Sequence, residues 1–212
     1  MTEFQESGLT FQFNEDWVVN KYDEHRYFRR LAGEGLKGVD FLGIYKKEEL
    51  VLIEVKNYRI RYKEKPPTAI YNIIENPEIL AEKIQKKAED TLKAIRVINK
   101  MYQRNWFYNL WMPVLKLLRN SSRTANTWLF WTRAQVLIEK KHFKVVLWLE
   151  NEKEYEIFSK EDVLGFREKV QITLDKSESN IHFEIIDIKK PKSSFNNSIS
   201  AFLDKNNNLK SS

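Results

Sequence analysis

The fold of this chain is decided by residues 33–59, GEGLKGVDFLGIYKKEELVLIEVKNYR. Within it, residues 38–45 and 50–58 are rich in the β-branched and aromatic side chains that favour strands. The charged run KKEE at residues 46–49 separates them over the length of a tight turn. We therefore predict two antiparallel strands joined as a β-hairpin.

The second of these strands carries charge at positions that interrupt an apolar pattern. Side chains alternate between the two faces of a strand, so Glu54 and Lys56 point to the same side. Val51, Ile53 and Val55 point to the other side, where they can be buried. Charged groups inside a protein are costly unless they are paired or bind a metal ion. Glu54 and Lys56 therefore require a structural or chemical explanation.

The hairpin also brings a second carboxylate to this patch. If the turn centres on Lys47 and Glu48, Asp40 lies opposite Glu54 or its neighbour Val55. Two carboxylates at that separation repel each other unless a cation lies between them. Oxygen ligands suit Mg²⁺ or Mn²⁺ better than zinc. Such an ion can polarise a phosphodiester and lower the pKa of its bound water.

Two interpretations of the patch follow from the residues. In the first, Asp40 and Glu54 bind the cation, and Lys56 orients the attacking water or stabilises charge on the phosphate. In the second, the hairpin lies at the surface, and Glu54 and Lys56 form an exposed ion pair that contributes little to stability.

The sequence Gly38-Val39-Asp40 followed by Glu54-Val55-Lys56 resembles the core motif of the PD-(D/E)XK, or restriction-endonuclease-like, nuclease superfamily. A helix before the hairpin and a long helix after it match the order of elements in that family. The resemblance covers about residues 20–100 and indicates no particular subfamily. Val39 stands where many members have proline.

The resemblance implies roles for individual residues. Asp40 and Glu54 would bind the metal together with the backbone carbonyl of Val55. Many members add an acidic residue from the first helix, and here we choose Glu24. Its rivals for that role are Asp23 and Glu34.

Basic residues near this patch are candidates for contact with nucleic acid. Arg59, Arg61 and Lys63 alternate along residues 59–67 and could track a phosphate backbone, or they could be a solvated basic edge. The helix after the Glu-x-Lys strand often presents a basic or Gln side chain to the site in the family. Its candidates here are Lys83, Gln85 and Lys87, against the alternative of a solvated helix face.

The pattern along the chain predicts an α/β (α+β mixed) fold with a central mixed β-sheet flanked by helices. We expect one nuclease-like domain over residues 1–189, with the core motif at 20–100 and further sheet and helices at 101–189, and a disordered tail at 190–212. A strand or an arm is expected over 1–18. Further strands are expected at 38–45, 50–58, 127–132, 143–149, 154–158 and 181–188, and helices at 20–31, 77–101 and 159–170.

Composition narrows the classes of function. The chain of 212 residues has no cysteine, which excludes disulfides, thiolate nucleophiles and Cys-based zinc sites and fits a reducing compartment. Its start lacks the features of a signal peptide, and no apolar run approaches the roughly 20 residues that span a bilayer. We expect a soluble, cytoplasmic protein without a membrane partner. A net charge of +6 favours polyanionic partners.

These features lead to three hypotheses. The first is a Mg²⁺- or Mn²⁺-dependent endonuclease or exonuclease that cleaves DNA rather than RNA. The second is a nuclease-fold module that binds nucleic acid or a protein partner without cleavage. The third is a homodimer formed by an aromatic segment around Trp106, Phe107, Tyr108 and Trp111, whose rings could otherwise stack on bases or lie in the core.

Overall fold

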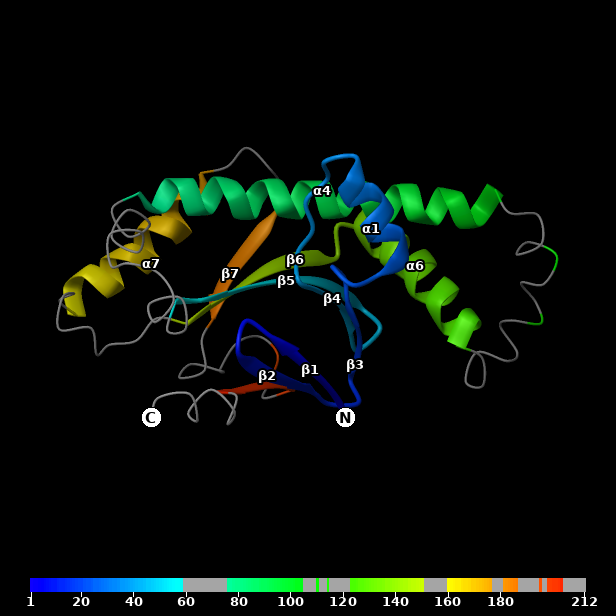
Figure 1. The fold of residues 1–212 in the computed structure, drawn as a ribbon, viewed down its shortest axis with the longest axis horizontal. Helices are drawn as coiled ribbons and strands as arrows, with labels where there is room; N and C mark the ends of the chain where they lie inside the picture. The colour runs from blue at the N-terminus through cyan, green and yellow to red at the C-terminus, as the bar shows by residue number, and fades with distance from the viewer. Residues whose placement is uncertain are drawn as a thin grey trace.

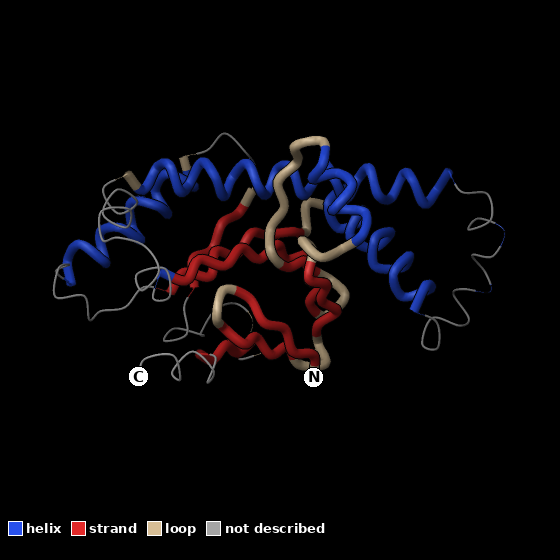
Figure 2. The backbone as a smooth tube through the Cα atoms, viewed as in Figure 1, coloured by secondary structure: helices blue, strands red, loops and turns tan. Residues whose placement is uncertain are grey.

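In the computed structural model, a five-stranded sheet lies between a layer of helices and a smaller three-stranded sheet (Figure 1). The structure describes residues 1–58, 76–104, 110, 114, 123–150, 160–176, 181–186, 195 and 198–203. The two sheets and the helices form a mixed α/β fold (Figure 2), which confirms the predicted class with its central mixed sheet.

The elements have the following bounds. The five-stranded sheet contains β3 (Trp17–Lys21), β4 (Phe41–Tyr45), β5 (Glu49–Asn57), β6 (Phe143–Glu150) and β7 (His182–Ile186) in that spatial order. The three-stranded sheet contains β1 (Thr2–Glu6), β2 (Leu9–Phe13) and β8 (Ile199–Leu203), with β2 in the middle. The described helices are α1 (Arg26–Gly33), α4 (Pro77–Arg104), α6 (Arg123–Glu139) and α7 (Lys160–Asp175).

The five-stranded sheet changes direction at β5. Strands β3, β4 and β5 pair antiparallel, whereas β5, β6 and β7 pair parallel. Parallel neighbours need a long crossover, and α4 and α6 lie between β5 and β6 in the chain. The carboxyl ends of β5 and β6 therefore meet at one end of the sheet.

The predicted hairpin is confirmed as β4 and β5. Tyr45 faces Glu49 and Phe41 faces Ile53, and the turn between them includes Lys46 and Lys47 with positive φ angles of 48° and 62°. The turn therefore centres within half a residue of the predicted position, and the expected pairing follows from it.

The two faces of this hairpin enter different cores. Leu42 and Leu52 pack in the cluster shared with the helices. Phe41, Val51 and Ile53 pack in the cluster shared with the three-stranded sheet, where the Phe11 and Phe41 ring centroids are 5.3 Å apart. The strand alternation inferred from the sequence is thus confirmed, and positions 40, 54 and 56 belong to the helix-covered side.

The N-terminal residues form a hairpin rather than one strand or arm. Ser7 and Gly8 connect β1 to β2 with φ angles of 50° and 71°, the paired positive values of a two-residue hairpin turn. The predicted first helix was placed too early, because Asn20 and Lys21 pair with β4 as the end of β3. Helix α1 begins only at Arg26.

The predicted strand at 127–132 is wrong, because these residues belong to helix α6. Its local sequence is rich in aromatic and β-branched residues, but Trp128, Trp131, Ala134 and Ile138 are buried at steps of three and four. The helical period of the longer segment overrides the local strand preference. Trp128 and Trp131 lie in the core.

The predicted disordered tail is wrong for the part that the structure describes. Residues 199–203 form β8, which pairs antiparallel with β2, and Phe195 is buried between the two sheets. The Trp17 indole also donates a 2.8 Å hydrogen bond to the Ser198 hydroxyl. The C-terminal segment therefore completes the three-stranded sheet.

The other predicted elements fare as follows. The helix at 77–101 and the strand at 143–149 are confirmed with slightly longer bounds, and the helix at 159–170 extends to Asp175. The strand at 181–188 is confirmed over His182–Ile186. The predicted strand at 154–158 and the basic segment at 59–67 lie outside the described residues. In the described part of the chain, no helix has the length and apolar character needed to cross a membrane.

Candidate active site

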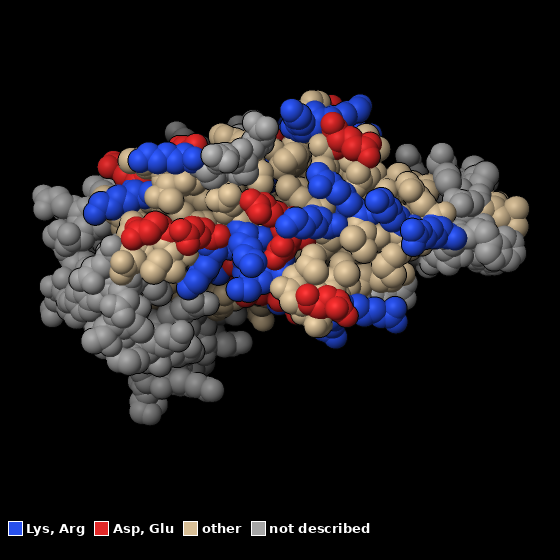
Figure 3. Space-filling view, turned by 90° about the horizontal axis from the view of Figure 1, so that it is seen from above, with Lys and Arg blue, Asp and Glu red and all other residues tan. Residues whose placement is uncertain are grey.

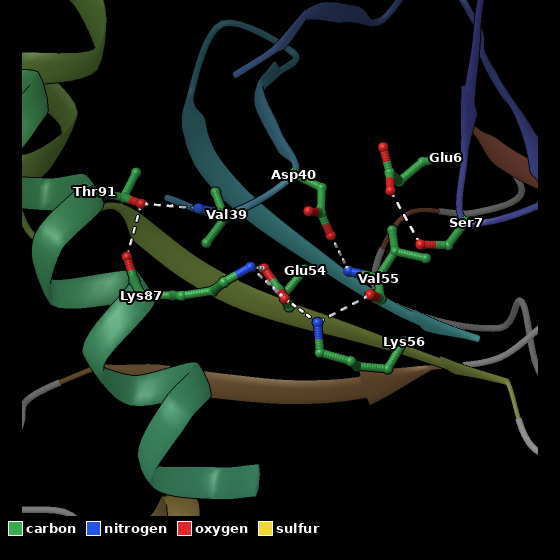
Figure 4. A network of polar contacts seen from close by, with 9 residues as sticks. All are labelled: Glu6, Ser7, Val39, Asp40, Glu54, Val55, Lys56, Lys87 and Thr91. Atoms are coloured by element: carbon green, nitrogen blue, oxygen red, sulfur yellow. Dashed lines mark hydrogen bonds and ion pairs between the residues drawn. The ribbon is translucent and has the colours of Figure 1, made fainter. Parts of the chain in front are cut away.

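The predicted patch lies where the carboxyl end of β5 meets helix α4 (Figure 4). Asp40 immediately precedes β4, and its backbone N–H donates to the carbonyl of Ile53 at 3.1 Å. Its side-chain Oδ2 accepts a 2.6 Å hydrogen bond from the Val55 N–H. The Asp40 side chain thus takes the place of a strand carbonyl and is fixed beside Glu54.

Glu54 is held by two lysines from different elements. Its side chain is fully buried, and Lys87 of α4 donates to Oε1 at 2.7 Å and to Oε2 at 2.9 Å. Lys56 also contacts Glu54 Oε1, and its Nζ lies 3.3 Å from the carbonyl oxygen of Val55. Figure 4 shows both ammonium groups meeting at the Glu54 carboxylate. The exposed ion pair considered from the sequence is therefore wrong, because Glu54 has no exposed surface.

Helix α4 also holds the segment that carries Asp40. The buried Thr91 hydroxyl accepts a 3.1 Å hydrogen bond from the Val39 N–H and donates to the Lys87 carbonyl at 2.7 Å. One residue earlier, the Asp90 carboxylate accepts from the Lys37 N–H at 3.2 Å. These bonds fix the approach of Asp40 to the same helix that presents Lys87.

Close packing fixes the same segment from its other side. A Cβ added at Gly38 would lie 2.6 Å and 2.7 Å from ring atoms of Phe28 and 2.9 Å from the Tyr22 ring. The backbone of Gly38 is therefore pressed against two buried aromatic side chains, Tyr22 just after β3 and Phe28 in α1. Only a residue without a side chain fits there without displacing them.

The electrostatics of the site favour a neutral Asp40 in the absence of a cation. Burial and, to a smaller extent, the negative charge of Glu54 together raise the pKa of Asp40 from 3.8 to about 7. The positive charges of Lys87 and Lys56 and the hydrogen bond from Val55 act in the opposite direction. The raised pKa shows that burial and Glu54 outweigh the nearby positive charge.

The oxygen atoms gathered here fit a hard divalent cation. They are the Asp40 and Glu54 carboxylates and the Val55 carbonyl, and Mg²⁺ and Mn²⁺ prefer such donors. Oδ1 of Asp40 accepts no hydrogen bond from any described residue. Within the described ranges, no group of three or more Asp, Glu, His or Cys side chains is close enough to hold a metal ion. Two carboxylates and one carbonyl are therefore the donors that these residues offer.

In the described part of the chain, none of the three acidic candidates near α1 contacts Asp40 or Glu54. Glu24 is 59% exposed and pairs with Lys21 at 2.9 Å. Its rivals Asp23 and Glu34 are also exposed. The described contacts of Asp40 and Glu54 include none of these carboxylates, so an assisting role for Glu24 stays a prediction.

The basic candidates differ in whether they contact the site. Among the three predicted positions on α4, Lys83 is exposed and Gln85 donates to Glu89 at 3.0 Å, so Lys87 is the one that reaches the site. Arg59, Arg61 and Lys63 lie outside the described residues, as does the aromatic segment from Trp106 to Trp111.

Sequence reasoning assigned no role to Asp90 or Thr91. Both are buried polar residues among the apolar positions Ala88, Leu92 and Ile95 of α4. Polar residues on an apolar helix face are a usable signal, because buried polar groups require hydrogen-bond partners.

Comparison of the chain with family models, curated proteins and solved structures gave no match.

Proposed function

We propose that this chain is a metal-dependent nuclease of the PD-(D/E)XK type that hydrolyses phosphodiester bonds, in DNA rather than RNA. The observation that carries the proposal is the buried Glu54 carboxylate beside Asp40, with Lys56 and Lys87 on it at the end of a mixed sheet. The helix, hairpin and helix of α1, β4–β5 and α4 follow the order of the resembled family and support the same proposal.

Asp40, Glu54 and the Val55 carbonyl would hold Mg²⁺ or Mn²⁺. When bound, the ion would polarise the phosphodiester and lower the pKa of the attacking water. Lys56 supplies a positive charge at the same place, where it would orient that water or stabilise charge that develops on the phosphate. Asp40 is ionised more readily beside a cation, so the site and the ion fit each other electrostatically.

A polyanionic substrate is also consistent with the surface of the helix layer. Figure 3 shows Lys and Arg side chains spread over this face, with acidic side chains between them. The exposed basic residues of α4 are Lys83, Lys86, Lys93, Arg96, Lys100 and Arg104. Such a surface attracts a phosphate backbone through long-range electrostatics, and the cytoplasm is the compartment we propose for this encounter.

Cleavage of plasmid and single-stranded DNA in Mg²⁺ or Mn²⁺ tests the proposal. We expect wild type to cleave at least one substrate and Lys56→Ala to lose about 100-fold or more of that rate. Lys140→Ala removes one exposed charge just before β6, at the opposite end of the sheet, and is the control that should keep most activity. If wild type and Lys56→Ala show the same background cleavage rate on every substrate, the proposed nuclease activity is refuted.

The exposed basic residues of α4 also favour a second candidate, a nuclease-fold module that binds nucleic acid without cleaving it. Salt-dependent DNA binding that neither Asp40→Asn nor Mg²⁺ changes would support this candidate. Binding that strengthens with Mg²⁺ in wild type and not in Asp40→Asn would support the nuclease.

A further inference from the structure

Lys87 occupies the part of Glu54 that a metal ion would need. Its Nζ contacts both carboxylate oxygens, at 2.7 Å and 2.9 Å, and Lys56 shares Oε1. Glu54 is fully buried, so it cannot turn outward to offer an oxygen elsewhere. Any cation that binds Glu54 therefore meets an ammonium group already in place.

The charges of the site do not allow both lysines to stay when a cation enters. Two ammonium groups already contact the buried Glu54 carboxylate, and Asp40 is held beside it by the Val55 N–H. A divalent cation between Asp40 and Glu54 would leave positive charge in large excess within a few ångströms. Like charges at that range repel strongly in a buried site. One ammonium group must then move away from Glu54.

The structure distinguishes which lysine can leave. Lys56 is 15% exposed and lies two residues from Glu54 on the same face of the same strand. Lys87 is 26% exposed and reaches Glu54 from a separate helix. The Lys87 backbone is fixed by the bond from Thr91 to its carbonyl, so the movement is confined to a long, flexible side chain.

Building on the nuclease proposed above, we propose that Lys87 is an internal counter-charge that competes with the divalent cation for Glu54. In the metal-free protein, Lys87 neutralises the buried Glu54 and keeps the site closed to weakly held cations. Once displaced, Lys87 swings toward solvent beside the site and binds a phosphate oxygen of the substrate. Substrate phosphates thereby favour the metal-loaded state, because they offer Lys87 a new anionic partner.

If Lys87 competes with the cation, removing its ammonium group should strengthen metal binding. Mn²⁺ is titrated by calorimetry at pH 8 into wild type, Lys87→Met and the control Lys86→Met, which loses an exposed charge one residue away. A charged hydrogen bond contributes enough that we expect Lys87→Met to bind Mn²⁺ about tenfold more tightly than wild type. Lys86→Met should stay within about twofold of wild type.

Two results would overturn the proposal in distinguishable ways. Equal or weaker Mn²⁺ binding by Lys87→Met, with clear binding by wild type, refutes the competition and leaves the proposed nuclease intact. Absence of Mn²⁺ binding by wild type and by Lys87→Met refutes both.

A second measurement uses wild type and does not depend on the folding of a variant. Lys87 is labelled with an amine-specific acetylating reagent, with and without Mn²⁺, and the labelled residue is quantified by mass spectrometry. We expect labelling of Lys87 to become faster with saturating Mn²⁺ while that of Lys86 is unchanged. An unchanged rate at Lys87 under saturating Mn²⁺ would show that it stays on Glu54, and the proposal would be wrong.

Discussion

Replacement of Asp40 by asparagine is expected to stabilise the metal-free protein at neutral and alkaline pH. Burial and the charge of Glu54 raise the pKa of Asp40 from 3.8 to about 7. Each unit of pKa difference corresponds to about 1.4 kcal/mol, so ionised Asp40 costs on the order of 4 kcal/mol. Asparagine keeps an oxygen that can accept the Val55 N–H but carries no charge.

The sign of the pH dependence follows from the same values. Below pH 3.8 Asp40 is protonated in the folded and the unfolded chain, and it contributes no pH dependence. Between pH 3.8 and about 7 only the unfolded chain releases the proton, so wild type loses stability as pH rises. Above about pH 7 the loss is complete and stays constant. The Asp40→Asn protein lacks this loss of stability at every pH.

Urea unfolding in EDTA at pH 5, 6, 7 and 8 measures the difference directly. We expect Asp40→Asn to exceed wild type by about 2–4 kcal/mol at pH 8, with a gap that shrinks steadily toward pH 5. Glu48→Gln removes an exposed carboxylate from the turn of the same hairpin and should show no such trend. A gap that is absent at pH 8, or equal at pH 5 and pH 8, would refute the argument that burial raises the pKa of Asp40.

Three further substitutions test how the site and the sheets are held. Thr91→Val removes the acceptor of a buried 3.1 Å bond and should lower the free energy of unfolding by about 1–3 kcal/mol, whereas an unchanged urea midpoint would contradict this role. Gly38→Ala places a Cβ 2.6 Å from Phe28 and should cost about 1–3 kcal/mol, while Gly33→Ala meets no atom within 4 Å and should cost little; equal effects would contradict the packing argument. Phe195→Ala should cost about 3–5 kcal/mol in thermal unfolding, and a negligible loss would show that the C-terminal segment adds no stability.

The convergence of Asp40, Glu54 and Lys56 was predictable because it depends on local rules. Strand alternation fixes which side chains share a face, and a short turn fixes which residues face each other. The choice of Lys87 over Lys83 on α4 was not predictable in the same way. It depends on how the long helix is rotated and shifted against the sheet, which is set by packing between segments far apart in the chain.

The errors in the predicted fold have the same physical origin. Residues 127–132 have the composition of a strand, but packing of the longer segment against the sheet favours a helix. Residues 199–203 form a short segment between polar residues. They become β8 because β2, which pairs with β1 on one side, offers its other edge for pairing. Both outcomes depend on tertiary partners that a local reading of the sequence does not contain.

The central claim is that Asp40 and Glu54 share a divalent cation beside Lys56. A crystal structure of the protein soaked in Mn²⁺ tests it most directly, because Mn²⁺ gives an anomalous signal that locates the ion without assumptions. We predict one anomalous peak within bonding distance of carboxylate oxygens of both Asp40 and Glu54, with the Val55 carbonyl as a third ligand. A crystal saturated with Mn²⁺ that shows no peak between these two carboxylates would contradict the claim.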